Sequence, residues 1–97
     1  MVEQGEIISV EGIEWPCVVV SKNQYNKSDH VIVCPITKQK DATLGYKVSV
    51  GNISGFVQCD NLRMFDLTKR HVSSKDRVSM FDMIQILSRV NALFDII

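Results

Sequence analysis

One stretch decides the fold. It is Val31-Ile32-Val33-Cys34-Pro35-Ile36-Thr37, which continues into Lys38-Gln39-Lys40. Its first half is continuously apolar and rich in β-branched side chains, a pattern typical of a strand buried on both faces. Pro35 has no backbone N–H to donate, so we expect the pairing of the sheet to loosen there. The loosened end brings Thr37 and two lysines to the surface, where a hydroxyl beside ammonium groups suits a bound phosphate. The alternative is an ordinary charged exit from the core.

The composition indicates a single globular domain, residues 1–97, with one modest core. Apolar residues make up 45% of the chain and charged residues 23%, as in a soluble globule rather than a disordered tail. The formal net charge is zero, so the chain is not a globally basic nucleic-acid binder. Any contact with nucleic acid must come from local charge. The segment 22–47 offers it, because five lysines stand there against Asp29 and Asp41.

The cysteines indicate a reducing compartment. Cys17, Cys34 and Cys59 each lie inside a strand-like run, and an odd count without a small-scaffold spacing predicts buried thiols rather than disulfides. No His/Cys spacing suits a metal, so we expect no metal and no other cofactor. The first residues lack the basic start and apolar core of a signal peptide, and no apolar run is long enough for a membrane span. We therefore expect a cytoplasmic protein with no membrane contact.

Strand-like runs fill the first 60 residues. Residues 6–10 alternate weakly, and residues 17–21 are continuously apolar after Trp15-Pro16, so both are predicted to be strands. The polar segment 22–30 is predicted to be a hairpin loop into the central strand. Residues 46–50 alternate cleanly. A further strand is predicted at 56–60, where a period of two places Gln58 and Asp60 on one face.

The C-terminal third holds the clearest helix signal. Residues 61–75 are charged and irregular, and we expect the end of a strand, a short helical turn and a loop there. Ser79 is a good N-cap, and Asp82 stands where its charge favours the start of a helix. The apolar residues that follow have the spacing of one helical stripe, and they are Met83, Ile86, Leu87, Val90, Leu93 and Phe94. The chain is therefore predicted to be mainly β, with antiparallel strands and one long C-terminal α-helix. Its apolar ending, 93–97, either docks on the sheet or is covered by a partner chain.

Several pieces of the sequence occur in the order of a known family. They are Gly5-Glu6-Ile7, Pro16–Ser21, Val33–Thr37, Gly55–Asp60, the residues Arg63, Asp66 and Arg70, and the C-terminal helix. With these pieces the chain resembles the MazF/PemK/Kid family of toxin endoribonucleases from type II toxin–antitoxin pairs. The resemblance implies a small SH3-like β-barrel of the PemK/CcdB kind and a homodimer. It also implies sequence-specific cleavage of single-stranded RNA, and a cognate antitoxin protein that occupies the RNA groove.

The resemblance also implies site residues. Cleaving RNA through its own 2′-hydroxyl needs a base, an acid and donors for the charge of the phosphorane. Thr37 matches the family's threonine at the end of the central strand, and Asp60 matches the aspartate of an Arg-Cys-Asp triplet. We predict that Thr37, Asp60 and Gln58 are catalytic. The predicted RNA-binding residues are Trp15, Ser21, Asn26, Lys38, Lys40 and Arg63.

Two positions depart from the family. Trp15 and Gln58 stand where the family has arginines, and neither an indole nor an amide supplies a charged, bidentate fork. Losing one preorganised charge stabiliser typically lowers the rate on the order of a hundred- to a thousandfold. The loop between the first two strands is also shorter than in the family. Lys38, Lys40 or Arg63 are the candidates to replace the lost charge.

Structural roles compete with these assignments. Trp15 has the alternative of capping the barrel, and Asp60 that of forming a turn before Asn61. A surface ion-pair cluster is the alternative role for Arg63, Asp66 and Arg70. His30 and His71 receive no role.

Three functions therefore stay open. The first is an RNA-cleaving toxin, and the second is a catalytically impaired relative that binds RNA or an antitoxin. The third is a CcdB-like gyrase poison, because that family shares the fold and also ends in an apolar helix. The internal Pro-Ile-Thr and Cys-Asp motifs argue against the third.

Overall fold

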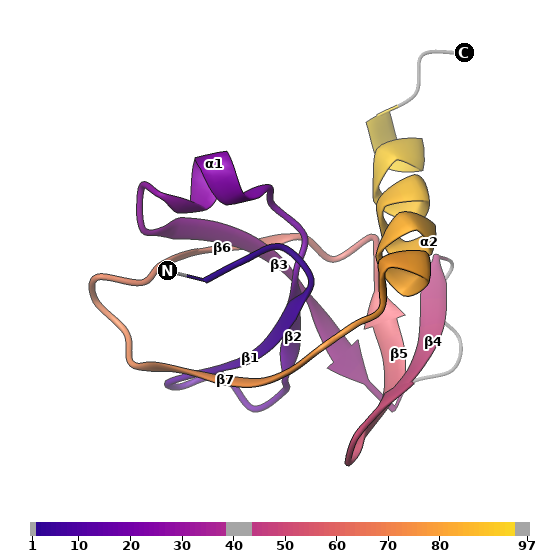
Figure 1. The fold of residues 1–97 in the computed structure, drawn as a ribbon, viewed down its shortest axis with the longest axis horizontal. Helices are drawn as coiled ribbons and strands as arrows, with labels where there is room; N and C mark the ends of the chain where they lie inside the picture. The colour runs from indigo at the N-terminus through magenta and orange to yellow at the C-terminus, as the bar shows by residue number, and fades with distance from the viewer. Residues whose placement is uncertain (1, 39–43, 95–97) are drawn as a thin grey trace.

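The computed structural model describes residues 2–38 and 44–94, which form a curled sheet with one long helix beside it (Figure 1). The elements, in chain order, are β1 (Glu6–Val10), β2 (Cys17–Val19), α1 (Asn23–Asn26), β3 (His30–Thr37), β4 (Gly45–Val50), β5 (Ile53–Gln58), β6 (Arg63–Asp66), β7 (Val72–Arg77), α2 (Met80–Asn91) and the 3-10 turn η1 (Ala92–Phe94). Figure 1 shows α2 standing beside β4 and β5. The prediction of a mainly β fold with antiparallel strands and a C-terminal helix is confirmed.

The strand β3 organises the sheet, as its sequence predicts. The strand order is β4-β5-β3-β2-β1-β7, and β6 also pairs with β3. One edge of β3 pairs with β2, whereas the other pairs with β6 over residues 30–33 and with β5 over residues 36–37. Ile36 N–H donates to Pro16 O on the β2 side, at 2.8 Å. Successive N–H groups of a strand point to opposite edges, so the donor that Pro35 lacks would face the edge that pairs with β6 and β5. Pro35 stands at the position where the partner at this edge changes from β6 to β5. The expected loosening is confirmed at that edge.

Two apolar clusters share β2 and β3. The larger lies between the sheet and α2 and contains Ile7, Val18, Val20, Cys34, Ile36, Val48, Val57, Cys59, Val78, Met83, Ile86 and Val90. The smaller lies on the opposite face and contains Ile8, Val10, Cys17, Val19, Val31 and Val33. Alternate residues of β3 thus enter both clusters. The prediction that this strand is buried on both faces is confirmed.

The cysteines take part in this burial. All three are free and buried, and burial raises the pKa of Cys17 and of Cys59 to about 11 and that of Cys34 to about 12. The prediction of buried thiols is confirmed. Within the described ranges, no helix has the length and apolarity that crossing a membrane requires.

The helix α2 begins as predicted and ends earlier than predicted. Ser79 Oγ accepts a hydrogen bond from the N–H of Asp82 at 3.1 Å, which caps the helix. Met83, Ile86 and Val90 are buried, but α2 stops at Asn91. Leu93 and Phe94 then lie in η1, where Phe94 is 68% exposed. The prediction that these two residues extend the buried stripe is wrong, and neither of them docks on the sheet.

Two segments differ from their predicted structure. The polar connection 22–30 holds the short helix α1 rather than only a loop. Residues 61–75, predicted to contain a helical turn, instead form β6 and most of β7. In β7 only Val72 is partly buried, and its five other residues are exposed. An edge strand of this kind has no apolar alternation that the sequence could reveal.

Candidate functional site

The candidate site is built on the paired ends of β3 and β5. Thr37, the last residue of β3, pairs with Phe56 of β5. The side chain of Gln58, which is 9% exposed, donates from Nε2 to Thr37 Oγ1 at 2.8 Å and to Phe56 O at 3.2 Å. A neutral amide therefore fixes the Thr37 hydroxyl. The residue that replaces the family's second arginine keeps a donor role without its charge.

An open hollow of about 260 Å³ lies beside this pair, and we call it the Thr37 hollow. It is lined by Trp15, Pro16, Ile36, Thr37, Lys38, Asn52, Ile53 and Ser54. Lys38 Nζ donates to Ser54 O at 2.9 Å and to Ser54 Oγ at 3.3 Å. The structure thus brings a hydroxyl, an ammonium group and an indole into one hollow. Asn52, from the β4–β5 connection, and Ser54, at the start of β5, were not predicted, because their place depends on how β4 and β5 fold back against β3.

A smaller hollow, which we call the Arg63 hollow, lies on the other side of Trp15. It is lined by Ile13, Trp15, Cys17, Pro35, Arg63 and Phe65. Trp15 lines both hollows and is 41% exposed, which counts against the alternative that it only caps the core. Arg63 Nε donates to Asn61 Oδ1 at 3.1 Å. Arg63 pairs with Val33, four residues before Thr37 on β3, which is about 13 Å of strand length. Its charge therefore belongs to the Arg63 hollow, and the charge beside Thr37 is that of Lys38.

Asp60 lies away from this arrangement. β5 ends at Gln58, and the N–H of Asn61 donates to Gln58 O at 3.0 Å, which closes a four-residue turn. Gln58 is buried and Asp60 is exposed, so the prediction that both project together is wrong. A period of two holds only within a strand, and Asp60 lies beyond the end of this one. Among the described residues, Asp60 lines neither hollow.

The predicted RNA ligands Ser21 and Asn26 have structural partners. Asn26 is 2% exposed, and its Nδ2 donates to Ser21 O at 3.0 Å. Ser21 Oγ donates to Asn26 Oδ1 and accepts from the N–H of Ile32 at 3.0 Å. These bonds tie α1 to β3, and the burial of Asn26 corrects the prediction that it contacts RNA. Lys40 falls outside the described residues.

The alternative of an ion-pair cluster on β6 and the loop after it is wrong. Asp66 accepts hydrogen bonds from the N–H and the Oγ1 of Thr68, which lower the pKa of its carboxyl, and His30 lies 3.9 Å away. The guanidinium of Arg70 lies over the ring of Phe65, 5.2 Å from its centroid, and donates to Glu11 O at 3.1 Å. Among the described residues, Arg63 and Arg70 therefore form no salt bridge with an acidic side chain.

Comparisons with known proteins agree with this geometry. The family described as "PemK-like, MazF-like toxin of type II toxin-antitoxin system" matches residues 4–94. The chain belongs to this family. The match favours the MazF/PemK interpretation over a CcdB-like gyrase poison. A comparison with curated proteins finds no match.

Solved structures share the fold of this MazF-like toxin. A MazE-MazF crystal structure (Form-I) from Deinococcus radiodurans has a TM-score of 0.85 at 19% identity, covering 96% of this chain and 94% of that one. An "endoribonuclease in complex with its cognate antitoxin" from a mycobacterial species has a TM-score of 0.82 at 15% identity, covering 97% and 95%. The Mycobacterium tuberculosis toxin MazF-mt6 has a TM-score of 0.76 at 15% identity, covering 97% and 99%. At these identities the likeness establishes the fold alone.

Proposed function

We propose that this toxin is a sequence-specific endoribonuclease that cleaves single-stranded RNA through the RNA's own 2′-hydroxyl. The observation that supports it is the Thr37 hollow, where a hydroxyl fixed by Gln58 stands beside the ammonium group of Lys38. An open hollow with a positioned donor set and a cation suits an anionic phosphodiester. Structures of similar fold that are described as endoribonucleases and as a MazF toxin support the same activity.

Each residue has a role in the proposed reaction. The 2′-oxygen attacks phosphorus as its proton passes to a base, and the bond from phosphorus to the 5′-oxygen breaks. The leaving 5′-oxygen takes a proton from water, which gives a 2′,3′-cyclic phosphate and a 5′-hydroxyl end. Thr37 holds a phosphate oxygen, and Lys38 stabilises the charge that develops on the phosphorane. For the proton of the 2′-hydroxyl we propose Asp60 as acceptor. Asp60 lines neither hollow, so this role requires the 2′-hydroxyl of the bound RNA to lie over the turn after β5, between the Thr37 hollow and this carboxylate. This carboxylate is exposed in the turn directly after Gln58, and it matches the family's aspartate.

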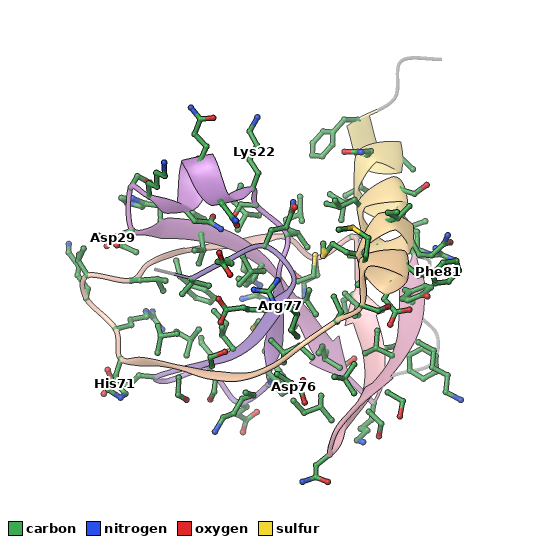
Figure 2. The ribbon with its side chains drawn as sticks, viewed as in Figure 1. Lys22, Asp29, His71, Asp76, Arg77 and Phe81 are labelled. Atoms are coloured by element: carbon green, nitrogen blue, oxygen red, sulfur yellow. The ribbon has the colours of Figure 1, made fainter. Side chains whose placement is uncertain are left out.

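We also propose two protein partners. The first is a cognate antitoxin, because similar structures are complexes of this kind of toxin with MazE or with a cognate antitoxin. The second is another copy of this chain. Met80, Phe81 and Ile84 are exposed on α2, and Figure 2 shows Phe81 projecting outward from this helix. Apolar exposure of this extent on one helix suits the interface of a homodimer. We place this homodimer in the cytoplasm, where the RNA substrate is found. A monomeric mass by light scattering would contradict the dimer.

The test is cleavage of a mixed-sequence single-stranded RNA, with detection of fragments that end in 2′,3′-cyclic phosphate. Thr37→Val keeps the β-branched shape and removes the hydroxyl, and Lys38→Gln removes the charge. We expect each to lower cleavage about tenfold or more, since each removes a stabiliser of the transition state. Lys75→Gln is the matched control, because this exposed lysine on β7 lines neither hollow. Equal cleavage by Thr37→Val and the parent would move the active site elsewhere.

Asp60 needs its own variant. Asp60→Asn should abolish cleavage, and the activity of the parent should fall in mild acid as a carboxylate base becomes protonated. Full activity of Asp60→Asn would leave Asp60 as a turn residue only.

A catalytically impaired toxin is the second candidate, and a specific observation favours it. Both positions at which the family has arginines are occupied by neutral groups, and the remaining cation of the Thr37 hollow is a single lysine. If the parent binds single-stranded RNA and neither it nor Gln58→Arg cuts any RNA, this candidate replaces the first. The Gln58→Arg variant is informative, because a charged fork near the phosphorane acts mainly in the transition state.

A further inference from the structure

Aromatic and cationic side chains continue from the Thr37 hollow along one face of the sheet. Trp15 separates the Thr37 hollow from the Arg63 hollow and lines both. Beyond it, Arg63 and Phe65 line the Arg63 hollow, and Arg70 lies over the ring of Phe65. The series from the Thr37 hollow outward is therefore Lys38, Trp15, Arg63, Phe65 and Arg70. Positive groups that alternate with aromatic faces are the usual composition of surfaces that bind single-stranded nucleic acid.

The register of the sheet gives this series its direction and length. Thr37 pairs with Phe56, Pro35 with Cys17, Val33 with Arg63, and Val31 with Phe65. The series thus follows β3 backward from Thr37 to Val31, a length of about 20 Å at the usual rise of a strand. It ends near the β6–β7 connection, whose His71 lies at the end of the molecule remote from α2 (Figure 2). It therefore leads away from the exposed apolar face of α2.

The outermost charge is held in place. Arg70 Nη1 donates to Glu11 O at 3.1 Å, and the Phe65 ring lies beneath its guanidinium. Gly12, with φ +85°, takes the left-handed conformation that the β1–β2 loop needs beside this guanidinium. The carboxylate of Glu11 is nearby and accepts from the backbone N–H of His71 at 3.2 Å. Arg70 thus joins the loop that holds Trp15 to the loop after β6.

We propose that this face is a second RNA subsite, which binds nucleotides next to the scissile phosphate. In it Trp15 stacks on a base, and Arg63 contacts a backbone phosphate outside the Arg63 hollow, which at about 10 Å³ is too small to hold a phosphate. Arg70 on Phe65 contacts a phosphate further along. The inference rests on the proposed function, because it concerns the same RNA strand. It assigns a stacking role to the indole that stands in place of the family's arginine. It also adds Phe65 and Arg70 to the residues that meet RNA.

Trp15 is the only tryptophan of the chain, so its fluorescence reports on the subsite directly. The probe is a mixed-sequence 2′-O-methyl oligonucleotide, which cannot be cleaved because its 2′-oxygen is blocked. Titration into the intact protein should quench the emission of Trp15, with a Kd that agrees with the anisotropy of a labelled probe. Trp15→Ala should weaken binding about 5- to 150-fold, the range for loss of one stacked base, and Trp15→Phe should restore most of it.

The arginines are tested by salt dependence. Arg63→Gln and Arg70→Gln should each lower the slope of log Kd against log salt by about one, as expected when one phosphate contact is lost. Lys75→Gln is the control, because Lys75 is exposed on β7, which β2 and β1 separate from β3. An unchanged slope in both arginine variants would overturn their role in the subsite.

The combinations of binding, quenching and cleavage distinguish the failure of the subsite from the failure of the proposed function. Binding and cleavage without any quench would show that RNA bypasses Trp15, which overturns the subsite and leaves the function intact. Equal quenching by an abasic oligonucleotide or by polyglutamate would overturn base stacking, and the second probe would point to an acidic protein partner. Absence of both binding and cleavage would overturn both proposals. Quenching by the uncleavable probe supports the subsite even if the protein cuts no RNA.

Discussion

The bonds that fix the Thr37 hydroxyl are tested most directly by Gln58→Met. Methionine keeps the unbranched length of glutamine and removes both N–H donors. The bonds lost include those from Nε2 to Thr37 Oγ1 at 2.8 Å and to Phe56 O at 3.2 Å. Two neutral hydrogen bonds contribute about 2 kcal/mol together. The apolar thioether of methionine is more favourable to bury than an amide, and this offsets a part of those roughly 2 kcal/mol. We therefore expect the free energy of unfolding to fall by about 1.5 kcal/mol.

This loss has two measurable consequences. In a domain of this size 1 kcal/mol corresponds to about 4–8 °C, so the Tm should fall by about 6–12 °C in a circular dichroism melt. Cleavage should be measured well below both melting temperatures. The kcat should fall about tenfold to a hundredfold, because the hydroxyl is no longer held in its productive position. The KM should change little, since Lys38 keeps its bonds to Ser54.

The control is Gln24→Met, because Gln24 is exposed on α1 and surface changes of this kind alter stability by less than about 0.5 kcal/mol. An unchanged Tm in Gln58→Met would show that these bonds add no net stability. A lower Tm with an unchanged kcat would refute the reasoning at the site, because Gln58 would then support the fold without positioning Thr37.

Three further predictions concern the scaffold. Iodoacetamide at pH 8 should leave Cys17, Cys34 and Cys59 unmodified in the folded protein, because their thiols are buried and their pKa values are raised to about 11 to 12. In urea all three should be labelled. Labelling of the native protein would contradict this burial. Ser79→Ala removes the cap of α2 and should lower the free energy of unfolding in urea by about 1 kcal/mol, and an unchanged value would show that the cap adds nothing. Tyr46 donates to Asp82 Oδ1 at 2.7 Å, and this bond is the main cause of its raised pKa. The folded state then holds the phenolic proton more tightly than the unfolded chain, so stability falls as pH rises above the ordinary tyrosine pKa of about 10. Urea titrations at pH 8 and 11 should show that the free energy of unfolding falls less with pH in Tyr46→Phe than in the parent. An equal fall in both proteins would show that the bond between Tyr46 and Asp82 does not cause the loss of stability.

The sequence predicts the parts of the fold that have strong local signals. The β-branched run of β3 needs burial on both faces, and the structure places Val31 and Val33 in one cluster and Cys34 and Ile36 in the other. The cap at Ser79 is likewise local. The sequence does not predict β7, because this strand is stabilised by pairing with β1 and not by apolar burial of its own residues. Propensity cannot reveal a strand whose partner lies about 65 residues earlier in the chain.

The site divides in the same way. Thr37 and Lys38 follow from the end of one strand, so the sequence brings them together correctly. The bond between Gln58 and Thr37 depends on the register that pairs Thr37 with Phe56, which no local pattern specifies. The place of Trp15 between two hollows depends on the path of the β1–β2 loop, and the contact of Arg70 with Glu11 helps to fix that loop. Asp60 was misplaced because a strand pattern was extended two residues past the end of β5.

The two replaced arginines have different consequences for the chemistry. At Gln58 the amide still reaches Thr37, so the orientation of the hydroxyl survives and only the charge is lost. At Trp15 the charge and the bidentate fork are lost, one indole N–H donor remains, and an aromatic face is gained between two hollows. Charge near the phosphorane then depends on Lys38, a flexible point charge held by Ser54, whereas an arginine would offer a rigid fork. A toxin built in this way has less electrostatic stabilisation at the scissile phosphate and more surface for neighbouring bases. Affinity for the RNA strand would therefore rest on the Trp15–Arg70 face, and the rate would rest on Thr37 and Lys38.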